Sequence, residues 1–185
     1  RRLLSCVAQL AAEGVDALGP LFDLTAHKLV RLAVAITRQQ QDAEDAVQAA
    51  LVRLATQPRL LGAVDAPWAY LLRMVRNESL VILRRRHNLP RLGADLSDLP
   101  TCCPVDEVEQ EESRRAVWVA LRELPTEQAE VVVLKIWEQM TFAQIAEVLE
   151  ASPNTVASRY QYAITKLSTK LRAKLPVERR EVRHD

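Results

Sequence analysis

The chain has 185 residues, of which 49% are hydrophobic and 26% charged. This composition supports a packed core and excludes wholesale disorder. Only four glycines occur and the net charge is +1, which argues against an all-β fold rich in tight turns, a glycine-rich phosphate loop and a uniformly basic protein. No apolar run approaches the ~20 residues of a membrane span, so we expect no membrane insertion.

The near-neutral net charge is the sum of two basic blocks and the acidic block between them. Residues 1–92 carry 13 basic and 8 acidic side chains, residues 93–113 carry seven acidic and no basic ones, and residues 114–185 carry 12 basic and 9 acidic ones. The middle block also contains a glycine and two prolines, a composition typical of linkers. We therefore expect two domains joined by a flexible acidic linker; a long loop inside one domain is the alternative.

The N-terminal block predicts three helices after a weaker helical pattern in residues 1–20, which breaks at Gly14 and again at Gly19-Pro20. The second helix begins at Asp42 as its N-cap, and the acidic Glu44 and Asp45 suit the positive end of the helix dipole. The third helix begins at Pro67, since proline suits a first turn. The expected buried stripes of the three helices are Leu29, Leu32, Ala33 and Ile36; Val47, Ala50, Leu51 and Leu54; and Trp68, Leu71, Leu72, Val75, Ser79 and Leu83.

Each notable feature of this block also has a plain structural explanation. The acidic residues after Asp42 could serve only as helix caps. The basic run Arg84-Arg-Arg86 could be a solvated helix C-terminus rather than a phosphate contact. Trp68 could be a core residue rather than a base-stacking one.

The C-terminal block predicts a helix-turn-helix. One helix carries Ala116, Ala120, Leu121 and Leu124, and the next begins at Pro125-Thr126 with Val132, Val133, Ile136 and Trp137 facing inward. Thr141 and Gln144 form a capping box before a short helix, and Ser152-Pro153 then starts a longer one. In such a unit the N-terminal residues of the second helix read base edges in the major groove. The solvent-facing candidates are Asn154, Thr155, Ser158, Arg159 and Tyr162, with Lys166 following on the same helix.

Together these motifs resemble the RNA polymerase sigma factors of the extracytoplasmic-function (ECF) type, in the sigma-70 family. The N-terminal motifs are Asp42-Ala-Glu-Asp-Ala-Val-Gln48, the tryptophan-led helix through Arg76-Asn77, and the basic run. The C-terminal motifs are Ala120-Leu-Arg-Glu-Leu-Pro125, Gln144-Ile-Ala-Glu-Val-Leu149 and Thr155-Val-Ala-Ser-Arg159. Their order and spacing make the resemblance specific.

The resemblance implies an all-α fold of two small helical domains. The expected organisation is an N-terminal extension (1–20), a sigma region 2-like bundle (21–88), an acidic linker (89–113), a sigma region 4-like helix-turn-helix domain (114–175) and a tail (176–185).

The resemblance also implies partners and site residues. Core RNA polymerase would dock on Asp42, Glu44, Asp45 and Gln48. The unpaired −10 promoter strand would contact the loop at about 56–66 together with Trp68, Arg73, Arg76, Asn77 and Arg84. The −35 element would be read by Asn154, Thr155, Ser158, Arg159, Tyr162 and Lys166. An anti-sigma protein is the expected inhibitor.

The sequence departs from the family pattern at several positions. Leu51 and Ala55 replace an aromatic residue and a tryptophan, Val81 replaces an aspartate, and Ala129 replaces an arginine. Glu150 replaces the usual turn glycine, and Ala157 replaces the basic residue before Ser158-Arg159. The last change lowers the charge of the recognition helix, so we expect a weaker or unusual grip on the −35 element.

Three functions fit the sequence. The first is a transcription-initiation specificity factor that takes core polymerase to −10 and −35 elements. The second is a helix-turn-helix regulator that does not act through core polymerase, and the third is a helical protein that only binds other proteins. The sequence contains no nucleophile elbow and no metal-ligand spacing, and its three histidines are scattered. We therefore expect a protein that is not an enzyme and needs no cofactor.

Overall fold

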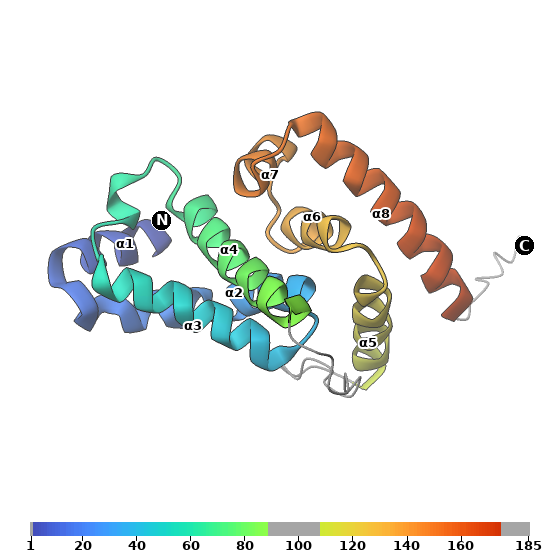
Figure 1. The fold of residues 1–185 in the computed structure, drawn as a ribbon, viewed down its shortest axis with the longest axis horizontal. Coiled ribbons are helices and arrows are strands. Elements are labelled where there is room, and N and C mark those ends of the chain that lie inside the picture. Colours follow the sequence, from blue (N-terminus) through green and yellow to red (C-terminus); the bar gives the residue numbers. More distant parts are fainter. Residues whose placement is uncertain (1, 89–107, 175–185) are drawn as a thin grey trace, which may run out of the picture.

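The computed structural model describes residues 2–88 and 108–174, and every regular element in these ranges is helical. The N-terminal bundle contains α1 (Arg2–Glu13), the short 3-10 helix η1 (Gly14–Ala17), α2 (Leu18–Thr37), α3 (Gln40–Thr56), η2 (Leu61–Ala63) and α4 (Pro67–Asn88). The C-terminal domain contains α5 (Val108–Arg122), α6 (Thr126–Ile136), α7 (Phe142–Leu149) and α8 (Pro153–Lys174). The predicted all-α fold of two small helical domains is confirmed (Figure 1).

The core of the N-terminal bundle lies where α2, α3 and α4 pack against one another. The predicted stripe of α2 is buried throughout, and α3 and α4 bury most of theirs, with Leu51, Trp68 and Leu83 half-buried. Val7 and Leu10 of α1 join the same core. At ~1.5–3 kcal/mol for each fully buried large apolar side chain, these stripes account for the packing of the bundle.

Two helix starts differ from the sequence-based prediction. Helix α3 begins at Gln40, with Gln39 as its N-cap, so Asp42 lies in the first turn and is not the cap. Its carboxylate still faces the positive end of the helix dipole. Helix α2 begins at Leu18 and includes Gly19-Pro20, because the N–H that proline lacks has no acceptor in a first turn.

The C-terminal domain is built by α6, α7 and α5 packing against α8. Val132 and Val133 are buried as predicted and Trp137 is half-buried, but Ile136 is 41% exposed because it ends α6. Helix α5 begins at Val108, inside the segment expected as linker. Its start, Val108-Glu-Gln-Glu-Glu112, combines good helix formers with acidic residues that favour a helix N-terminus. The rest of the expected linker, 89–107, and the tail lie outside the described residues.

The two domains are in direct contact. Helix α2 packs against α6, and α4 packs against α7, so the N-terminal bundle and the C-terminal domain form one elongated body with α8 on the side away from the bundle (Figure 1). The sequence suggested two independent modules on a flexible tether. Oppositely charged side chains face each other across this contact, beside an apolar core that continues through both domains. The one-dimensional pattern could not pair these residues.

Candidate nucleic-acid interface

The start of α8 is built as a helix-turn-helix requires. The Thr141 backbone N–H donates to Gln144 Oε1 at 2.9 Å, and the Gln144 N–H donates to Thr141 Oγ1 at 3.3 Å, which completes the predicted capping box of α7. After a three-residue turn, the Thr155 N–H donates to Ser152 Oγ at 3.1 Å. Both caps fix where the helices begin, so the turn holds α8 at a defined angle to α7.

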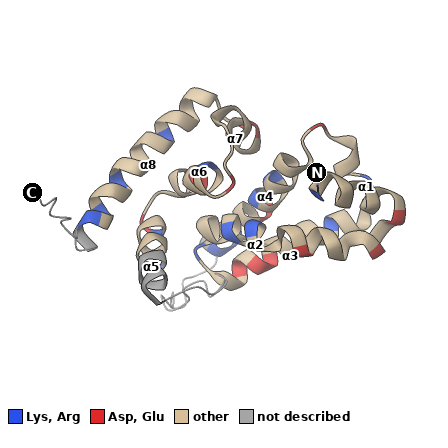
Figure 2. Cartoon of the chain, turned by 180° about the vertical axis from the view of Figure 1, so that it is seen from behind, with Lys and Arg blue, Asp and Glu red and all other residues tan. Residues whose placement is uncertain are grey.

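The outer face of this helix is open. Asn154, Thr155, Ser158, Tyr162 and Lys166 are all exposed, and Tyr162 keeps 66% of its surface in solvent. The opposite face, with Val156, Ala163 and Leu167, is buried in the domain. The first half of α8 thus presents an amide and hydroxyl groups, and Lys166 adds an ammonium group further along the helix. Such groups can read base edges or hold phosphates. Basic positions continue along the helix (Figure 2).

Arg159 differs from the other candidates of α8 because it is half-buried. Its positive charge acts on Glu130, a carboxylate of α6 that is only 1% exposed. Arg159 therefore belongs both to the candidate base-reading face and to the electrostatic surroundings of the buried carboxylate.

The residues predicted to dock polymerase lie on α3, whose acidic positions are visible in Figure 2. Glu44, Asp45 and Gln48 are exposed, and Glu44 accepts a hydrogen bond from Gln40. Asp42 is half-buried, and its carboxylate accepts a bond from Arg86 at 3.1 Å, which ties the start of α3 to the end of α4. Asp45 and Gln48 therefore form the accessible centre of this face.

The residues of α4 predicted to hold the −10 strand divide into two groups. Asn77 and Arg84 are exposed. Arg73 and Arg76 instead point to the C-terminal domain, where Arg73 lies 3.5 Å from Glu150 and Arg76 Nε lies 2.8 Å from Glu130. Trp68, at the start of the helix, is half-buried and has the Lys28 ammonium 5.5 Å from its ring centre.

Glu130 is a buried acid of this contact. Burial raises the pKa of its carboxyl, while the hydrogen bond and charge of Arg76 and the charge of Arg159 act in the opposite direction. Since desolvation disfavours the charged form, the carboxylate needs its arginine partner. The two hydrogen bonds from Arg76, at 2.8 and 3.3 Å, make this pair bidentate.

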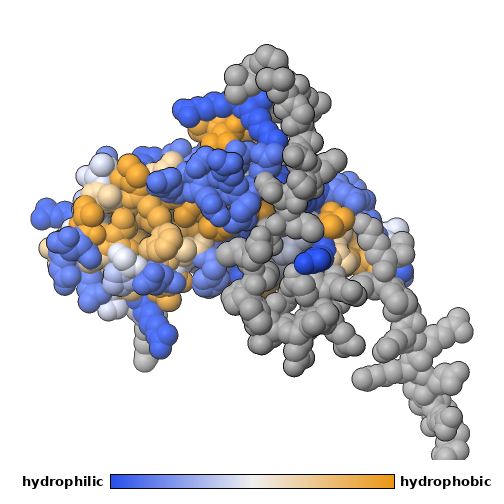
Figure 3. Space-filling view, turned by 90° about the horizontal axis from the view of Figure 1, so that it is seen from below, coloured by the Kyte–Doolittle hydropathy of each residue, from blue (hydrophilic) through white to orange (hydrophobic). Residues whose placement is uncertain are grey.

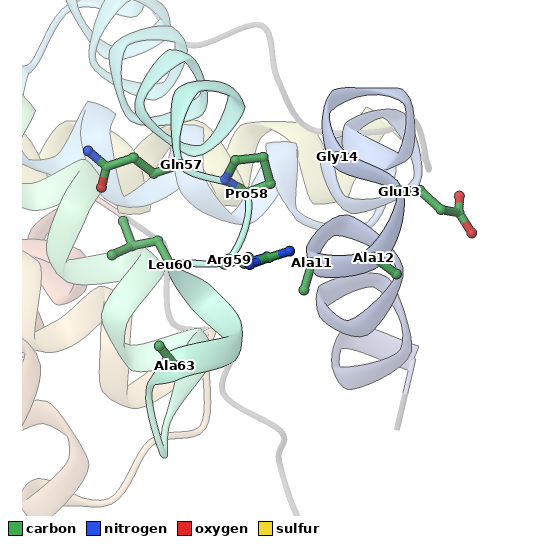
Figure 4. Close-up of a pocket in the computed structure, with 9 residues that line it drawn as sticks. All are labelled: Ala11, Ala12, Glu13, Gly14, Gln57, Pro58, Arg59, Leu60 and Ala63. Atoms are coloured by element: carbon green, nitrogen blue, oxygen red, sulfur yellow. The ribbon is translucent and has the colours of Figure 1, made fainter.

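The loop between α3 and α4 borders an open groove of about 630 Å³ against the end of α1 (Figure 4). Its walls are Ala11, Ala12, Glu13 and Gly14 on one side and residues 57–60 with Ala63 on the other. The Arg59 side chain extends across the groove toward α1 (Figure 4). Helix α1 thus backs the loop that was predicted to meet the unpaired strand.

The sequence analysis missed three residues of these surfaces. Lys28 and Arg31 of α2 lie 3.4 and 3.5 Å from Glu138 of the C-terminal domain. The sequence feature that could have identified Lys28 and Arg31 is their spacing, two cations one turn apart on the polar side of a buried helix. Val52 follows Gln48 by one turn on the same face of α3 and is 57% exposed. The sequence feature that could have identified Val52 is its position, an apolar residue outside the buried stripe of the helix.

Comparison with known proteins agrees with this geometry. The family profile of Sigma-70 region 2 matches residues 21–88, and that of Sigma-70, region 4 matches residues 114–167. The ECF RNA polymerase sigma factor SigL of Mycobacterium tuberculosis is 32% identical over 165 residues, covering 87% of this chain and 92% of that protein. The chain belongs to the ECF sigma factors of RNA polymerase. The RNA polymerase sigma-E factor of Streptomyces avermitilis is 33% identical over 148 residues, covering 79% of this chain and 80% of the relative.

Solved structures show the same fold. The structure of CnrH in complex with the cytosolic domain of CnrY matches with a TM-score of 0.64 at 24% identity, covering 94% of this chain and 99% of that one. The sigma factor RpoE in complex with the anti-sigma factor NepR, from Bartonella quintana, matches with a TM-score of 0.61 at 19% identity, covering 94% and 96%.

As an ECF sigma factor, the protein is a promoter-specificity factor that acts with RNA polymerase. Of the three functions considered from the sequence, family membership supports the first. No helix among those described is both long and apolar enough to cross a membrane. Residues 2–88 and 108–174 contain no group of three or more His, Cys, Asp or Glu side chains placed to hold a metal ion.

Proposed function

We propose that this sigma factor uses three separate surfaces, and that it acts in the cytoplasm. The exposed face of α3 docks core polymerase, the loop at about 56–66 and α4 hold the unpaired −10 strand, and the first half of α8 reads the −35 element. The observation that carries the proposal is the open start of α8, capped by Ser152, which presents Asn154, Thr155 and Ser158 to solvent.

The polymerase-docking surface centres on Asp45 and Gln48, with Val52 extending it by one turn. An exposed carboxylate, an amide and an apolar side chain in one row form a small mixed surface of the kind found at protein interfaces. Asp42 contributes less directly, because its carboxylate is held by Arg86.

The −10 surface combines charge with aromatic rings. Arg73 lies 5.1 Å from the Tyr70 ring centre, and Lys28 lies over Trp68. Cations interleaved with aromatic faces are the elements that bind single-stranded nucleic acid. Arg76, Asn77 and Arg84 extend the surface along α4, and a base flipped out of the stack needs such a waiting surface.

We also propose that an anti-sigma partner inhibits this protein. The support is that two solved structures similar to this chain are complexes, CnrH with the cytosolic domain of CnrY and the sigma factor RpoE with the anti-sigma factor NepR. Such a partner should compete with core polymerase, so in gel filtration the chain should elute with one or the other and not with both.

The docking surface is tested by combining Asp45→Lys with Gln48→Ala and measuring affinity for core polymerase. We expect binding to weaken by about 100-fold, the equivalent of about 2.7 kcal/mol, because the change reverses a charge at the centre of the contact. The matched control is Asp23→Lys with Gln9→Ala, the same changes at exposed sites of α2 and α1. Equal affinity of the two variants, with circular dichroism showing both folded, would overturn the docking assignment.

A further inference from the structure

Beside the apolar core that continues through both domains, several charged side chains pair across the contact between them. Four cations of the N-terminal bundle meet three carboxylates of the C-terminal domain: Arg76 with Glu130, Lys28 and Arg31 with Glu138, and Arg73 with Glu150. In addition, Arg38 Nη2 donates a 2.8 Å hydrogen bond to the Leu124 carbonyl. The Arg31 guanidinium also lies 6.0 Å from the Trp137 ring centre.

These pairs are shielded from water to different degrees. The side chains of Glu130 and Glu138 are 1% and 0% exposed, whereas that of Glu150 is 65% exposed. Both carboxylate oxygens of Glu138 lack a hydrogen-bond partner in the described structure. The charges of Lys28 and Arg31 therefore balance a carboxylate that has left solvent, which a buried anion requires.

Three non-glycine residues with a left-handed backbone lie at or next to the same contact. Across the described residues, the non-glycine residues with positive φ are Arg38 at 63°, Gln139 at 55° and Glu150 at 52°. Arg38 and Glu150 each bond across the domains, and Gln139 directly follows Glu138. Arg38 and Glu150 are the left-handed C-caps that end α2 and α7, so the two helix ends place these side chains at the domain contact.

The cations on this face are the groups that the −10 strand needs. Arg73 and Arg76 belong to the proposed −10 surface, and Lys28 covers Trp68 at its edge. We propose that the C-terminal domain masks the −10 surface of its own chain, with Glu130, Glu138 and Glu150 standing where the phosphates of the single strand would lie. The inference rests on the proposed role of α4 and adds an intramolecular competitor for that role.

Masking makes domain closure and strand binding mutually exclusive. A guanidinium held by a carboxylate in two hydrogen bonds cannot also hold a phosphate in the same way. The affinity of the chain for single-stranded DNA is then reduced by the fraction of molecules that are open. Any partner that separates the domains, core polymerase included, raises that fraction.

The test removes two masking charges without touching the DNA-binding cations. The variant Glu138→Gln with Glu150→Gln keeps the shape of both side chains. The control, Glu127→Gln with Glu147→Gln, removes two exposed charges from the same domain. Each full-length protein is titrated into a fluorescein-labelled, mixed-sequence single-stranded 12-mer and followed by anisotropy, and its radius of gyration is measured by small-angle X-ray scattering.

We expect the test variant to expand and to bind the oligonucleotide about tenfold more tightly than wild type. The control should stay compact and gain at most about twofold from its lower negative charge. Equal gains in the two variants would show a simple charge effect and overturn the proposal. So would a compact test variant, or an expanded one whose affinity does not rise.

A third arm separates this inference from the proposed function. Adding Arg73→Ala to the test variant should cancel the gain in strand affinity while leaving the chain expanded. If the gain survives, α4 does not hold the strand and the proposed −10 surface is wrong. If the gain never occurs while wild type still directs core polymerase to specific starts, masking alone is wrong.

Discussion

The two predicted DNA surfaces of this sigma factor differ in their exposure to solvent. Asn154, Thr155 and Ser158, in the first turns of α8, are open to solvent. The cations of α4 are engaged by carboxylates of α6 and by Glu150 at the end of α7. On the proposed assignments, the closed chain can bind duplex DNA through α8, whereas binding of the single strand by α4 requires the domains to separate.

The largest expected effect comes from breaking the buried pair behind the covered surface. Arg76→Ala leaves Glu130 without its bidentate partner, which should cost about 3–5 kcal/mol if the domains stay closed. Because burial already raises the pKa of Glu130 and Arg76 opposes that rise, the variant should raise it further.

The direction in which the stability deficit of Arg76→Ala changes with pH follows from the raised pKa of Glu130. An acid whose folded pKa is raised stabilises the folded state at low pH and loses this contribution as pH rises through the folded pKa. The deficit of Arg76→Ala relative to wild type should therefore be larger at about pH 8 than at about pH 5, measured by urea unfolding and by the radius of gyration. A variant with wild-type midpoint and compactness at both pH values would contradict the closed arrangement.

A smaller effect is expected on the open surface. Arg159→Ala should weaken use of the −35 element by about 1–3 kcal/mol if the guanidinium reads a base. The loss should depend on the sequence of that element, and run-off transcription on a set of upstream variants measures it. Lys166→Ala is the comparator, because a phosphate contact loses affinity evenly over all sequences. If Arg159→Ala behaves like Lys166→Ala, Arg159 contacts phosphate.

The smallest effect concerns the cap that sets the angle of α8. Ser152→Ala removes the acceptor of the Thr155 N–H and should lower the unfolding free energy by about 1 kcal/mol. Ser168→Ala, an exposed hydroxyl in the same helix, is the control and should stay within about 0.5 kcal/mol of wild type. Thermal unfolding of both variants checks this, and equal midpoints would mean that the cap does not stabilise the start of α8.

Local signals predicted the helices better than their relation to one another. The Thr141–Gln144 box and Ser152-Pro153 placed α7 and α8 correctly, because capping is decided within four residues. Asp42 was wrong as a cap, because Gln39 and a left-handed Arg38 start α3 earlier. Ile136 was wrong as a core residue because the helix ends there.

The closed contact could not be read from the sequence. Arg76 and Glu130 are 54 residues apart, and the pattern of each helix shows only that its charged residue lies off the main apolar stripe. The charge and family motifs gave the residue sets of the three surfaces. The packing of the two folded domains decides which of those residues face solvent and which face the other domain.

The most direct test of the central claim is in vitro transcription of a fragmented genomic library by core polymerase, with and without this chain, followed by sequencing of the transcript 5′ ends. The account predicts starts that occur only when the chain is present and that share two separated sequence elements upstream. It also predicts that Asp45→Lys with Gln48→Ala removes these starts. Transcript ends that are the same with and without the chain would contradict it.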